Sequence, residues 1–423
     1  MATEGFKFFH AADLHIDSPL RGLERYEEAP TEEIRSATRR AFENLVRRAI
    51  EESVAFMILA GDVFDGDWKD FGTGLWFAAR LRELTNEGIR VYIVAGNHDA
   101  QGKMTMSLTY PEAVRTFRTS APESFVDEPT GVVLHGQSFA KAATTEDLAS
   151  NYPASQAGAI NIGVLHTALT GREGHDPYAP CSPDSLRGKG YDYWALGHVH
   201  EREIVSEEPW IVFPGNLQAR HIRETGARGA TLVTVADGRI TSVTAEVFDV
   251  VRFARLEVDV GSCMSRSECE DAVAAKLADA RNEADGRLLA ARVEVTGRSA
   301  ANPVLRREVG AFVAACRDRA NSLGDVWVEK VKVETQDAAA SSGSDIVESL
   351  DLDSPELRAV VLAAVKADLT TLLDKLPAHV DLAGDGLDLR SDATLLGLMD
   401  EARDEVVRRL VEADSSATGE GEA

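Results

Sequence analysis

Five short polar motifs, each standing directly after an apolar run, constrain this chain more than any other feature. They are Asp13-Leu14-His15, Gly61-Asp62-Val63-Phe64-Asp65, Gly96-Asn97-His98-Asp99, Leu165-His166 and Gly197-His198-Val199-His200. Half of the ten histidines stand in these motifs. In an open α/β sheet, the loops that leave the carboxyl ends of the strands meet in one crevice. The motifs therefore predict an α/β fold in which Asp, Asn and His side chains converge.

The runs around the motifs alternate with helical patterns. Apolar, β-branched runs predict strands at 6–11, 54–60, 91–95, 160–165, 193–196, 210–213, 229–235 and 240–247. Amphipathic patterns predict helices at 31–52 and 74–87, between the first three strands. This β-α-β-α-β order favours parallel pairing, whereas the closer spacing of the later strands favours antiparallel pairing.

Three segments follow one another along the chain. Residues 1–250 hold all five motifs and form the first predicted domain. Residues 251–336 predict a small α/β domain, with strands at 251–258, 287–295 and 326–334 and helices at 266–283 and 305–323. Residues 337–423 predict a polar linker at 337–345, two helices beginning at Ser354 and Ser391, and a disordered acidic tail from Ala413.

The charge of the chain limits what it can bind. The formal net charge is −25, and residues 337–423 alone carry 20 acidic and 7 basic residues. Binding of nucleic acid through net charge needs a basic surface, because it depends on the release of counterions. A nucleic-acid contact must therefore come from a local patch, a metal site or a basic partner. One cluster of basic side chains offers such a patch, or else a solvated loop paired with Glu224: Arg220, His221, Arg223 and Arg228.

Composition also bears on the compartment. Hydrophobic residues make up 44% of the chain and charged residues 27%, which is an ordinary globular balance. No apolar run approaches the ~18 residues that span a bilayer, and the first residues lack the basic start of a secretory signal. The four cysteines form no CxxC pattern. We therefore expect a protein without membrane association, in the reducing cytoplasm.

The residue types of the motifs predict a dinuclear metal site. Imidazole and carboxylate without thiolate suit Mn, Fe, Zn or Ni. Two ions ~3.5–4 Å apart stabilise both the attacking and the leaving oxygen of a phosphoryl displacement. The glycines before Asp62, Asn97 and His198 allow tight turns that direct the next side chain into the crevice.

The order DxH, GDxxD, GNHD, H and GHxH resembles the signature of the calcineurin-like metallophosphoesterases. With Phe9-His10-Ala11-Ala12 before Asp13 and Ala100 after Asp99, it is similar to the SbcD-type DNA repair exonucleases, and nearest to their YhaO-like branch. The resemblance covers residues 6–250 well, the next block in outline, and the C-terminal helices only in type. It implies a layered α/β/β/α fold with mixed sheets, a small α/β cap domain and C-terminal helices.

The resemblance also implies a role for each motif residue. One metal ion would be held by Asp13, His15 and His200, the other by Asn97, His166 and His198, and Asp62 would bridge the two. His98 would face the scissile phosphate and protonate the leaving oxygen. Asp99 would orient His98, and Asp65 would lie in the loop or beside the ligands. Mn²⁺ is the favoured ion, with Fe, Zn or Ni as alternatives.

For several other polar residues, the sequence allows a structural role as well as a functional one. Asp17 stands where many SbcD-type enzymes carry glycine, which puts the shape of the first loop in question, and both Asp17 and Asp67 are predicted to be surface acids. His10 is left open between the core and a place beside the ligands. The remaining histidines outside the motifs are predicted to be structural or solvated: His135, His175 and His379. The stretch Pro214-Gly215-Asn216 is either a turn or a phosphate contact.

The function that these patterns favour is a Mn²⁺-dependent DNA exo/endonuclease subunit of an SbcCD-like repair complex. In that family the cap shapes which DNA ends enter, and the helical arm grips the coiled-coil base of an SbcC-like ATPase. The apolar faces of the C-terminal helices instead fit packing on their own chain equally well. Two other functions stay open, namely hydrolysis of small phosphoesters and a metal-free interaction scaffold. Strand preference, polarity and a homodimer are also left open.

Overall fold

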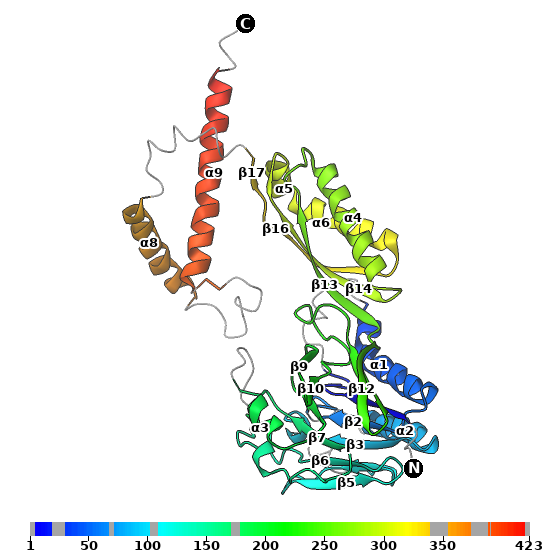
Figure 1. Ribbon diagram of the computed structural model, residues 1–423. Helices are drawn as coiled ribbons and strands as arrows, with labels where there is room; N and C mark the ends of the chain where they lie inside the picture. Colours follow the sequence, from blue (N-terminus) through cyan, green and yellow to red (C-terminus); the bar gives the residue numbers. More distant parts are fainter. Residues whose placement is uncertain are drawn as a thin grey trace. The chain divides into compact units, whose positions relative to one another are not determined.

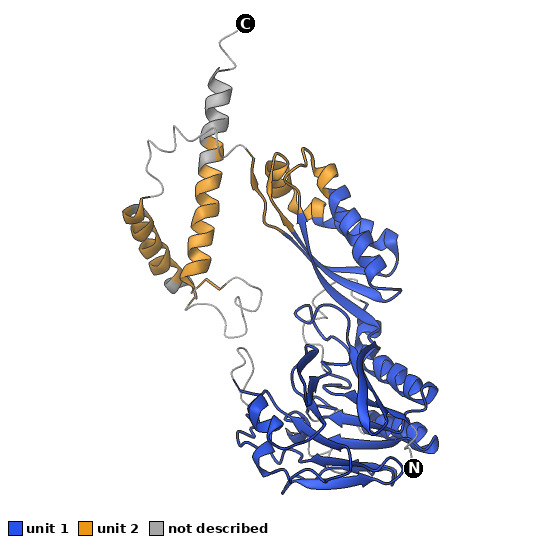
Figure 2. Cartoon of the chain, in the orientation of Figure 1, with its two compact units in different colours: residues 1–258, 270–294, 313–332 blue, residues 259–269, 295–312, 333–423 orange. Residues whose placement is uncertain are grey.

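The computed structural model describes residues 5–18, 30–66, 72–101, 109–170, 178–338, 354–373, 388–389 and 391–418 (Figure 1). The chain divides into two compact units, which Figure 2 colours separately. The first unit comprises Met1–Val258, Glu270–Glu294 and Val313–Lys332, and the second comprises Asp259–Cys269, Val295–Phe312 and Val333–Ala423. The five motifs all lie in the first unit.

A six-stranded mixed sheet forms the centre of the first unit. Its order is β12-β11-β1-β2-β3-β4, with bounds β1 Phe6–Ala11, β2 Phe56–Ala60, β3 Arg90–Val94, β4 Val114–Thr116, β11 Gly229–Ala236 and β12 Arg239–Val247. Strands β1 to β4 run parallel, and β11 and β12 pair antiparallel. Helices α1 (Thr31–Glu51) and α2 (Gly72–Asn86) make the crossovers and bury an apolar face against the sheet, with Phe42, Leu45, Phe77 and Leu81 in the same core as Phe9 and Met57.

A second six-stranded mixed sheet packs on the other face of the first. Its order is β5-β6-β7-β8-β10-β9, with bounds β5 Glu123–Asp127, β6 Val132–Gly136, β7 Asn161–His166, β8 Tyr193–Gly197, β9 Glu203–Glu207 and β10 Trp210–Phe213. The core between the sheets joins Phe8, Phe56 and Ile58 to Leu134, Ile162 and Tyr193. The outer face is covered by loops and the short helix α3 (Pro183–Arg187), which pack around Trp194. The prediction of an α/β fold with two mixed sheets is confirmed.

Several short elements escape prediction from the sequence. They are strands β4, β5, β6 and β9 and helix α3, each of three to five residues. Strands β5 and β9 lie at the edges of their sheet, where only one neighbour contributes hydrogen bonds and burial. The predicted strand 54–60 begins at Phe56 instead, since Ser53 adopts a left-handed φ of 51° in the turn after α1.

The next block of the chain contains the strands and helices predicted for it. Strands β13 (Val251–Asp259), β14 (Leu288–Thr296) and β16 (Val326–Val333) form one three-stranded sheet, and α4 spans Arg266–Glu283. The single helix predicted at 305–323 is two helices, α5 (Asn302–Arg307) and α6 (Val309–Leu323), because Glu308 leaves helical geometry at φ −117° and ψ 32°. Two short strands, β15 (Arg298–Ser299) and β17 (Gln336–Asp337), pair in parallel. The boundaries 250/251 and 336/337 stay predictions.

The C-terminal helices are α8 (Pro355–Leu373) and α9 (Asp392–Thr418). Ion pairs join Arg358 to Asp400 at 2.7 Å and Lys366 to Asp392 at 2.5 Å, so the two helices run antiparallel. The predicted disordered tail is wrong for residues 413–418, because α9 continues to Thr418; good helix formers such as Ala413 and Glu412 allow this. The rest of the tail, and most of the predicted linker, lie outside the described residues. No helix in the described part of the chain combines the length and apolarity that crossing a bilayer requires.

Gly163 in β7 provides a test of how the second sheet packs. A Cβ atom on Gly163 would lie 2.3 Å from Cε3 of Trp194 in the neighbouring strand, and Trp194 is fully buried. Gly163→Ala should therefore lower the free energy of unfolding by about 1–3 kcal/mol, because the ring must move or the strands must separate. Gly310→Ala in α6 is the control, since no described atom outside its own helix turn lies within 4 Å of the place that a Cβ would take. Equal denaturant midpoints for both variants would contradict the packing described here.

Candidate metal centre

The motif residues lie at the carboxyl ends of strands from both sheets. Asp13 and His15 follow β1, Asp62 follows β2, Asn97 and His98 follow β3, His166 ends β7, and His198 and His200 follow β8. Four of these residues adopt the left-handed region, with φ of 51° at Asp13, 43° at His15, 49° at Asp62 and 100° at His198. Residues other than glycine rarely adopt this conformation, and such strain gathers at functional sites.

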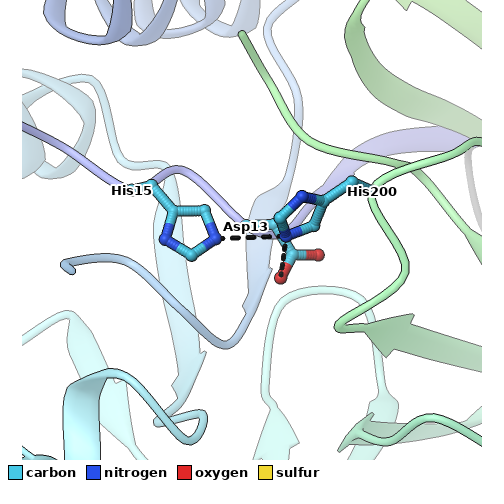
Figure 3. Close-up of side chains that lie close together, drawn as sticks. All are labelled: Asp13, His15 and His200. Atoms are coloured by element: carbon cyan, nitrogen blue, oxygen red, sulfur yellow. Dashed lines mark hydrogen bonds and ion pairs between the residues drawn. The ribbon is translucent and has the colours of Figure 1, made fainter. Parts of the chain in front are cut away.

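One cluster consists of Asp13, His15 and His200 (Figure 3). Nε2 of His15 lies 3.2 Å from Nε2 of His200, which in turn lies 3.9 Å from Oδ1 of Asp13. Nδ1 of His200 donates to Oε1 of Glu224 at 2.7 Å, so the lone pair of its Nε2 faces His15. Two imidazole nitrogens that face each other across 3.2 Å repel unless a proton or a cation lies between them.

A second cluster consists of Asp62, His166 and His198, with Asn97 beside it. Nδ1 of His166 donates to the carbonyl oxygen of Ala60 at 3.0 Å. Nε2 of His166 therefore faces two acceptors, Oδ1 of Asn97 at 3.0 Å and Oδ2 of Asp62 at 3.3 Å. His166, Asn97 and Asp62 are all buried, so positive charge is needed to satisfy this arrangement.

Asp62 belongs to both sides of the centre. It lies in one group of donors with His166 and His198 and in another with His15 and His98. Burial disfavours its charged form, but the charge and hydrogen bond of His166, together with the charges of His15 and His98, hold the pKa of Asp62 below its usual range. Burial likewise disfavours charged His166, yet the charge of Asp62 raises the pKa of His166 to about 9. This carboxylate is therefore placed to be shared.

His98 is held by Asp65, which differs from the predicted partner. Nδ1 of His98 donates to Oδ1 of Asp65 at 2.7 Å, and this bond raises the pKa of His98 above its ordinary value. The predicted orienting residue, Asp99, is buried and accepts backbone N–H groups instead, from Phe64 at 2.9 Å and Gly96 at 3.0 Å. Asp99 is the first residue of a short 3₁₀ turn, Asp99–Gln101. Its carboxylate fixes the shape of the two loops rather than the ring of His98.

Glu224 is a part of the centre that sequence reasoning missed. Besides His200, its carboxylate accepts from the backbone N–H of Arg220 at 2.7 Å and from Nδ2 of Asn216 at 3.0 Å. Burial opposes its ionisation, but the hydrogen bond from His200 holds the pKa of Glu224 below its usual range. Carboxylates in this position fix the orientation of a ligating imidazole. Glu224 lies in an irregular loop 24 residues after His200, where no spacing rule applies.

The loop that carries Glu224 is also bonded to the strand that follows the first domain. Gln218 donates to the carbonyl of Val251 at 2.8 Å and accepts from the N–H of Val250 at 2.8 Å. The N–H of Gly226 donates to the carbonyl of Phe253 in β13 at 3.1 Å. We refer to residues 214–228 as the 214–228 loop. It joins a predicted metal ligand to β13.

The basic residues predicted as a patch have different surroundings. Arg228 is buried and donates to the carbonyl of His200 at 2.5 Å, so it holds the backbone of a predicted metal ligand in place. His221 and Arg223 are exposed on the same loop. Arg220 approaches Glu224 and Asp65, at 3.8 Å and 3.7 Å. The predicted pairing with Glu224 is thus present for Arg220 and His221.

The remaining polar residues have structural surroundings. His10 is buried against Tyr193 and the carbonyl of Leu196, and burial lowers its pKa to about 3. His135 is bonded to Ser124 and Asn161. Asp17, at φ 58°, is paired with Arg39 and Thr73. Asn216 is buried beside Glu224 after the turn at Gly215 (φ 80°). Three residues lie outside the described part of the chain: Asp67, His175 and His379.

The donor set fits divalent cations that prefer nitrogen and oxygen. Among the described residues, each group of side chains close enough to hold an ion contains only His and Asp, and the four cysteines are buried elsewhere as free thiols. Each group combines imidazole nitrogens with a carboxylate. Mn, Fe, Zn and Ni all suit such ligands.

Glu224→Gln should weaken metal binding at the side of His200. The neutral amide loses the charge-assisted bond to Nδ1, so we expect a loss of about 10–100-fold in affinity for the ion held there. Mn²⁺ titration of the metal-free protein, followed by calorimetry, measures this. Glu201→Gln is the matched control, because Glu201 is exposed and pairs only with Arg228 among the described residues. Equal affinities in the two variants would contradict the role given to Glu224.

Comparison with known proteins connects this geometry to a family. Residues 6–202 match the family described as "Calcineurin-like phosphoesterase", and residues 253–336 match "Metallophosphoesterase YhaO, middle domain". The uncharacterized metallophosphoesterase YhaO of Bacillus subtilis (strain 168) is 39% identical over 257 residues, which cover 60% of this chain and 63% of that protein. The DNA double-strand break repair protein Mre11 of Methanopyrus kandleri is 26% identical over 212 residues, covering 45% of this chain and 44% of that protein. The chain thus spans less than two thirds of the length of these curated relatives.

Solved structures show more distant likenesses. The protein TT1561 of Thermus thermophilus aligns at 14% identity and a TM-score of 0.32, covering 54% of this chain and 93% of that one. A dimetal phosphatase from Danio rerio aligns at 12% identity and a TM-score of 0.34, covering 59% of this chain and all of that one. Taken together, these matches show that residues 6–202 are similar to the calcineurin-like phosphoesterases and that the chain is similar to YhaO.

Proposed function

We propose that this chain is a metal-dependent phosphodiesterase that cleaves DNA as the nuclease subunit of an SbcCD-like repair complex. The observation that carries the hydrolase part is the pair of donor clusters that share Asp62, with His98 held beside them. The superfamily implies hydrolysis of phosphoester bonds. Support for DNA as the substrate comes from the similarity to the Mre11 relative.

The donor clusters suggest which residues hold the metals. Mn²⁺ is the favoured ion, with Fe, Zn or Ni as alternatives, and the ligands would be Asp13, His15 and His200 on one side and Asn97, His166 and His198 on the other, with Asp62 shared. When bound, such ions stabilise negative charge on a phosphoryl group. The chain's own contribution is His98. Its Nδ1–H donates to Asp65, which favours the doubly protonated imidazolium, and the proton on Nε2 of that form can pass to the leaving oxygen.

Digestion of end-labelled linear duplex DNA in Mn²⁺ at low salt tests the substrate. Progressive shortening by the parent, lost in His98→Ala, is the expected result. If the DNA stays intact while a bis-aryl phosphate is hydrolysed, the catalytic site works but DNA does not reach it unaided. The same assay with an SbcC-like ATPase added then decides whether the partner delivers DNA.

Hydrolysis of small phosphoesters is the second candidate, and one observation favours it. The net charge of −25 repels a polyanion more than a small nucleotide. A metal-free scaffold on the same fold is the third candidate. Elemental analysis separates the scaffold from both enzymes, because a scaffold retains no stoichiometric metal.

The C-terminal helices are the proposed docking site for the ATPase. Apolar side chains lie exposed on both helices, with Val360 66% and Val406 48% exposed. Leu395 in α9, in contrast, is buried. An amphipathic pair of helices of this kind binds a coiled coil through its apolar face. The acidic balance of residues 337–423 suits a basic partner surface.

Deletion of residues 346–423 should abolish co-purification with an SbcC-like ATPase and leave hydrolysis of a bis-aryl phosphate unchanged, because the donor clusters lie within residues 13–200. Co-expression with the ATPase and affinity capture measure the first effect. Capture that is unchanged by the deletion would exclude these helices as the docking site.

The proposed compartment is the cytoplasm. All four cysteines are free thiols buried in the fold. Free buried thiols suit the reducing conditions in which an SbcCD-like complex acts on DNA. Fractionation of cells that express a tagged chain tests this directly.

A further inference from the structure

Arg220 stands at the edge of the candidate metal centre, and the acceptors of its side chain among the described residues all lie at 3.4 Å or more. Its side chain is only 15% exposed. Nη1 lies 3.4 Å from Oγ of Ser18 and 3.7 Å from Oδ2 of Asp65, and Nη2 lies 3.8 Å from Oε1 of Glu224. Charge-assisted hydrogen bonds are shorter, at about 2.7–2.9 Å. Nε is buried and has no hydrogen-bond partner in the described part of the chain.

The position of Arg220 is fixed by its backbone. Its N–H donates to Glu224 at 2.7 Å, and the flanking side chains of Ala219 and Ile222 are buried in one apolar cluster with Phe253. The backbone therefore positions the guanidinium near Asp65, and the guanidinium's own contacts with Ser18, Asp65 and Glu224 are long. A cation held in place with unused donors is suited to an anion that arrives from solution.

The neighbours of Arg220 indicate where such an anion would bind. Asp65, which Arg220 approaches, is the carboxylate that holds His98. His98 in turn shares a donor group with His15 and Asp62. An anion bound by Arg220 thus lies beside the residues proposed to act on the scissile phosphate. A planar guanidinium binds two phosphate oxygens with a rigid fork of parallel N–H donors, which the ammonium of lysine does not offer.

We propose that Arg220 binds non-bridging oxygens of the substrate phosphate and so selects an anionic phosphoester at the metal centre. The inference rests on the proposed phosphoesterase function and deepens it. It also explains how a chain of net charge −25 can accept an anionic substrate, because the attraction is local.

Binding of inorganic phosphate to the Mn²⁺-loaded protein, measured by calorimetry, tests this without turnover. Arg220→Met should weaken phosphate binding by about tenfold or more, since it removes charge-assisted bonds. Arg220→Lys should fall between the parent and Arg220→Met, because lysine keeps the charge and loses the fork. Arg223→Met is the matched control, an exposed arginine on the same loop, and should bind phosphate like the parent. Elemental analysis and melting temperatures of all three variants report metal content and folding.

The outcomes separate this inference from the proposed function. Phosphate affinity unchanged in Arg220→Met, or no phosphate binding by the loaded parent, overturns the role of Arg220. Equal loss of metal in Arg220→Met and Arg220→Lys overturns it as well, because the arginine would then only support the centre. If the loaded parent binds phosphate through Arg220 yet hydrolyses no phosphoester, the proposed function fails and the anion site stands. For an active parent, KM for a bis-aryl phosphate should rise in Arg220→Met more than kcat falls.

Discussion

His98→Ala should lower the rate of phosphodiester hydrolysis by about 10²–10⁴-fold while the protein keeps its metal ions. The ring is hydrogen-bonded to Asp65 and 35% exposed, and it is not one of the seven residues proposed as metal ligands. Its removal takes away the proton for the leaving oxygen but none of the donors Asp13, His166, His198 or His200. Turnover of a bis-aryl phosphate and elemental analysis on the same preparation measure the two quantities together.

Asp65→Asn provides a check on this assignment through pH. The hydrogen bond to Asp65 raises the pKa of His98, so His98 keeps its proton to higher pH than a free imidazole. Without the charge of Asp65, the pKa of His98 falls, and the alkaline limb of the rate profile should shift to lower pH. An alkaline limb at the same pH in Asp65→Asn as in the parent would contradict the role of Asp65. Equal losses of metal from His98→Ala and Asp62→Ala would contradict the role of His98.

Asp62→Ala should lose both the metal ions and the activity. Among the described residues, Asp62 is the one carboxylate placed in donor groups on both sides of the centre, and it also accepts the backbone N–H of His98 at 2.9 Å. Its removal leaves His166 without its counter-charge and opens the loop that carries His98. Because metal ions contribute several kcal/mol to transition-state stabilisation, we expect activity to fall by about 10³-fold or more.

Asp17→Asn is the matched control for Asp62→Ala. Asp17 lies two residues after His15, but its carboxylate pairs with Arg39 and Thr73. Asparagine tolerates the left-handed backbone at this position, where φ is 58°. Asp17→Asn should therefore keep its metal ions and most of its activity. Metal loss from both variants would mean that the first loop as a whole, rather than Asp62, holds the ions.

The sequence predicts the centre of this fold well because the relevant signals are local. Long apolar runs predict the buried strands β1, β2, β3, β7 and β8, and the polar residues after them lie where strand ends meet. Edge strands such as β5 and β9 escape prediction because their residues are only partly buried. Their pairing depends on neighbours far along the chain.

The supports of the site are harder to predict than its donors. The partner of His98 is Asp65, which lies in an earlier motif, whereas the sequence neighbour Asp99 accepts the backbone N–H of Phe64. Glu224 reaches His200 from an irregular loop. Both contacts form between loops that are separate in the sequence, and no periodic pattern in the sequence predicts such contacts.

The 214–228 loop connects the proposed metal centre to β13, a strand outside that centre. Glu224 holds His200 from within the loop, and Gln218 and Gly226 bond the same loop to β13 and the residue before it. A ligand that binds only the folded state stabilises everything whose order that state requires. Metal occupancy is therefore linked to the order of β13, a strand that supplies no donor to either cluster. Ions bound at His200 would therefore link the 214–228 loop and β13, and melting of β13 should release them.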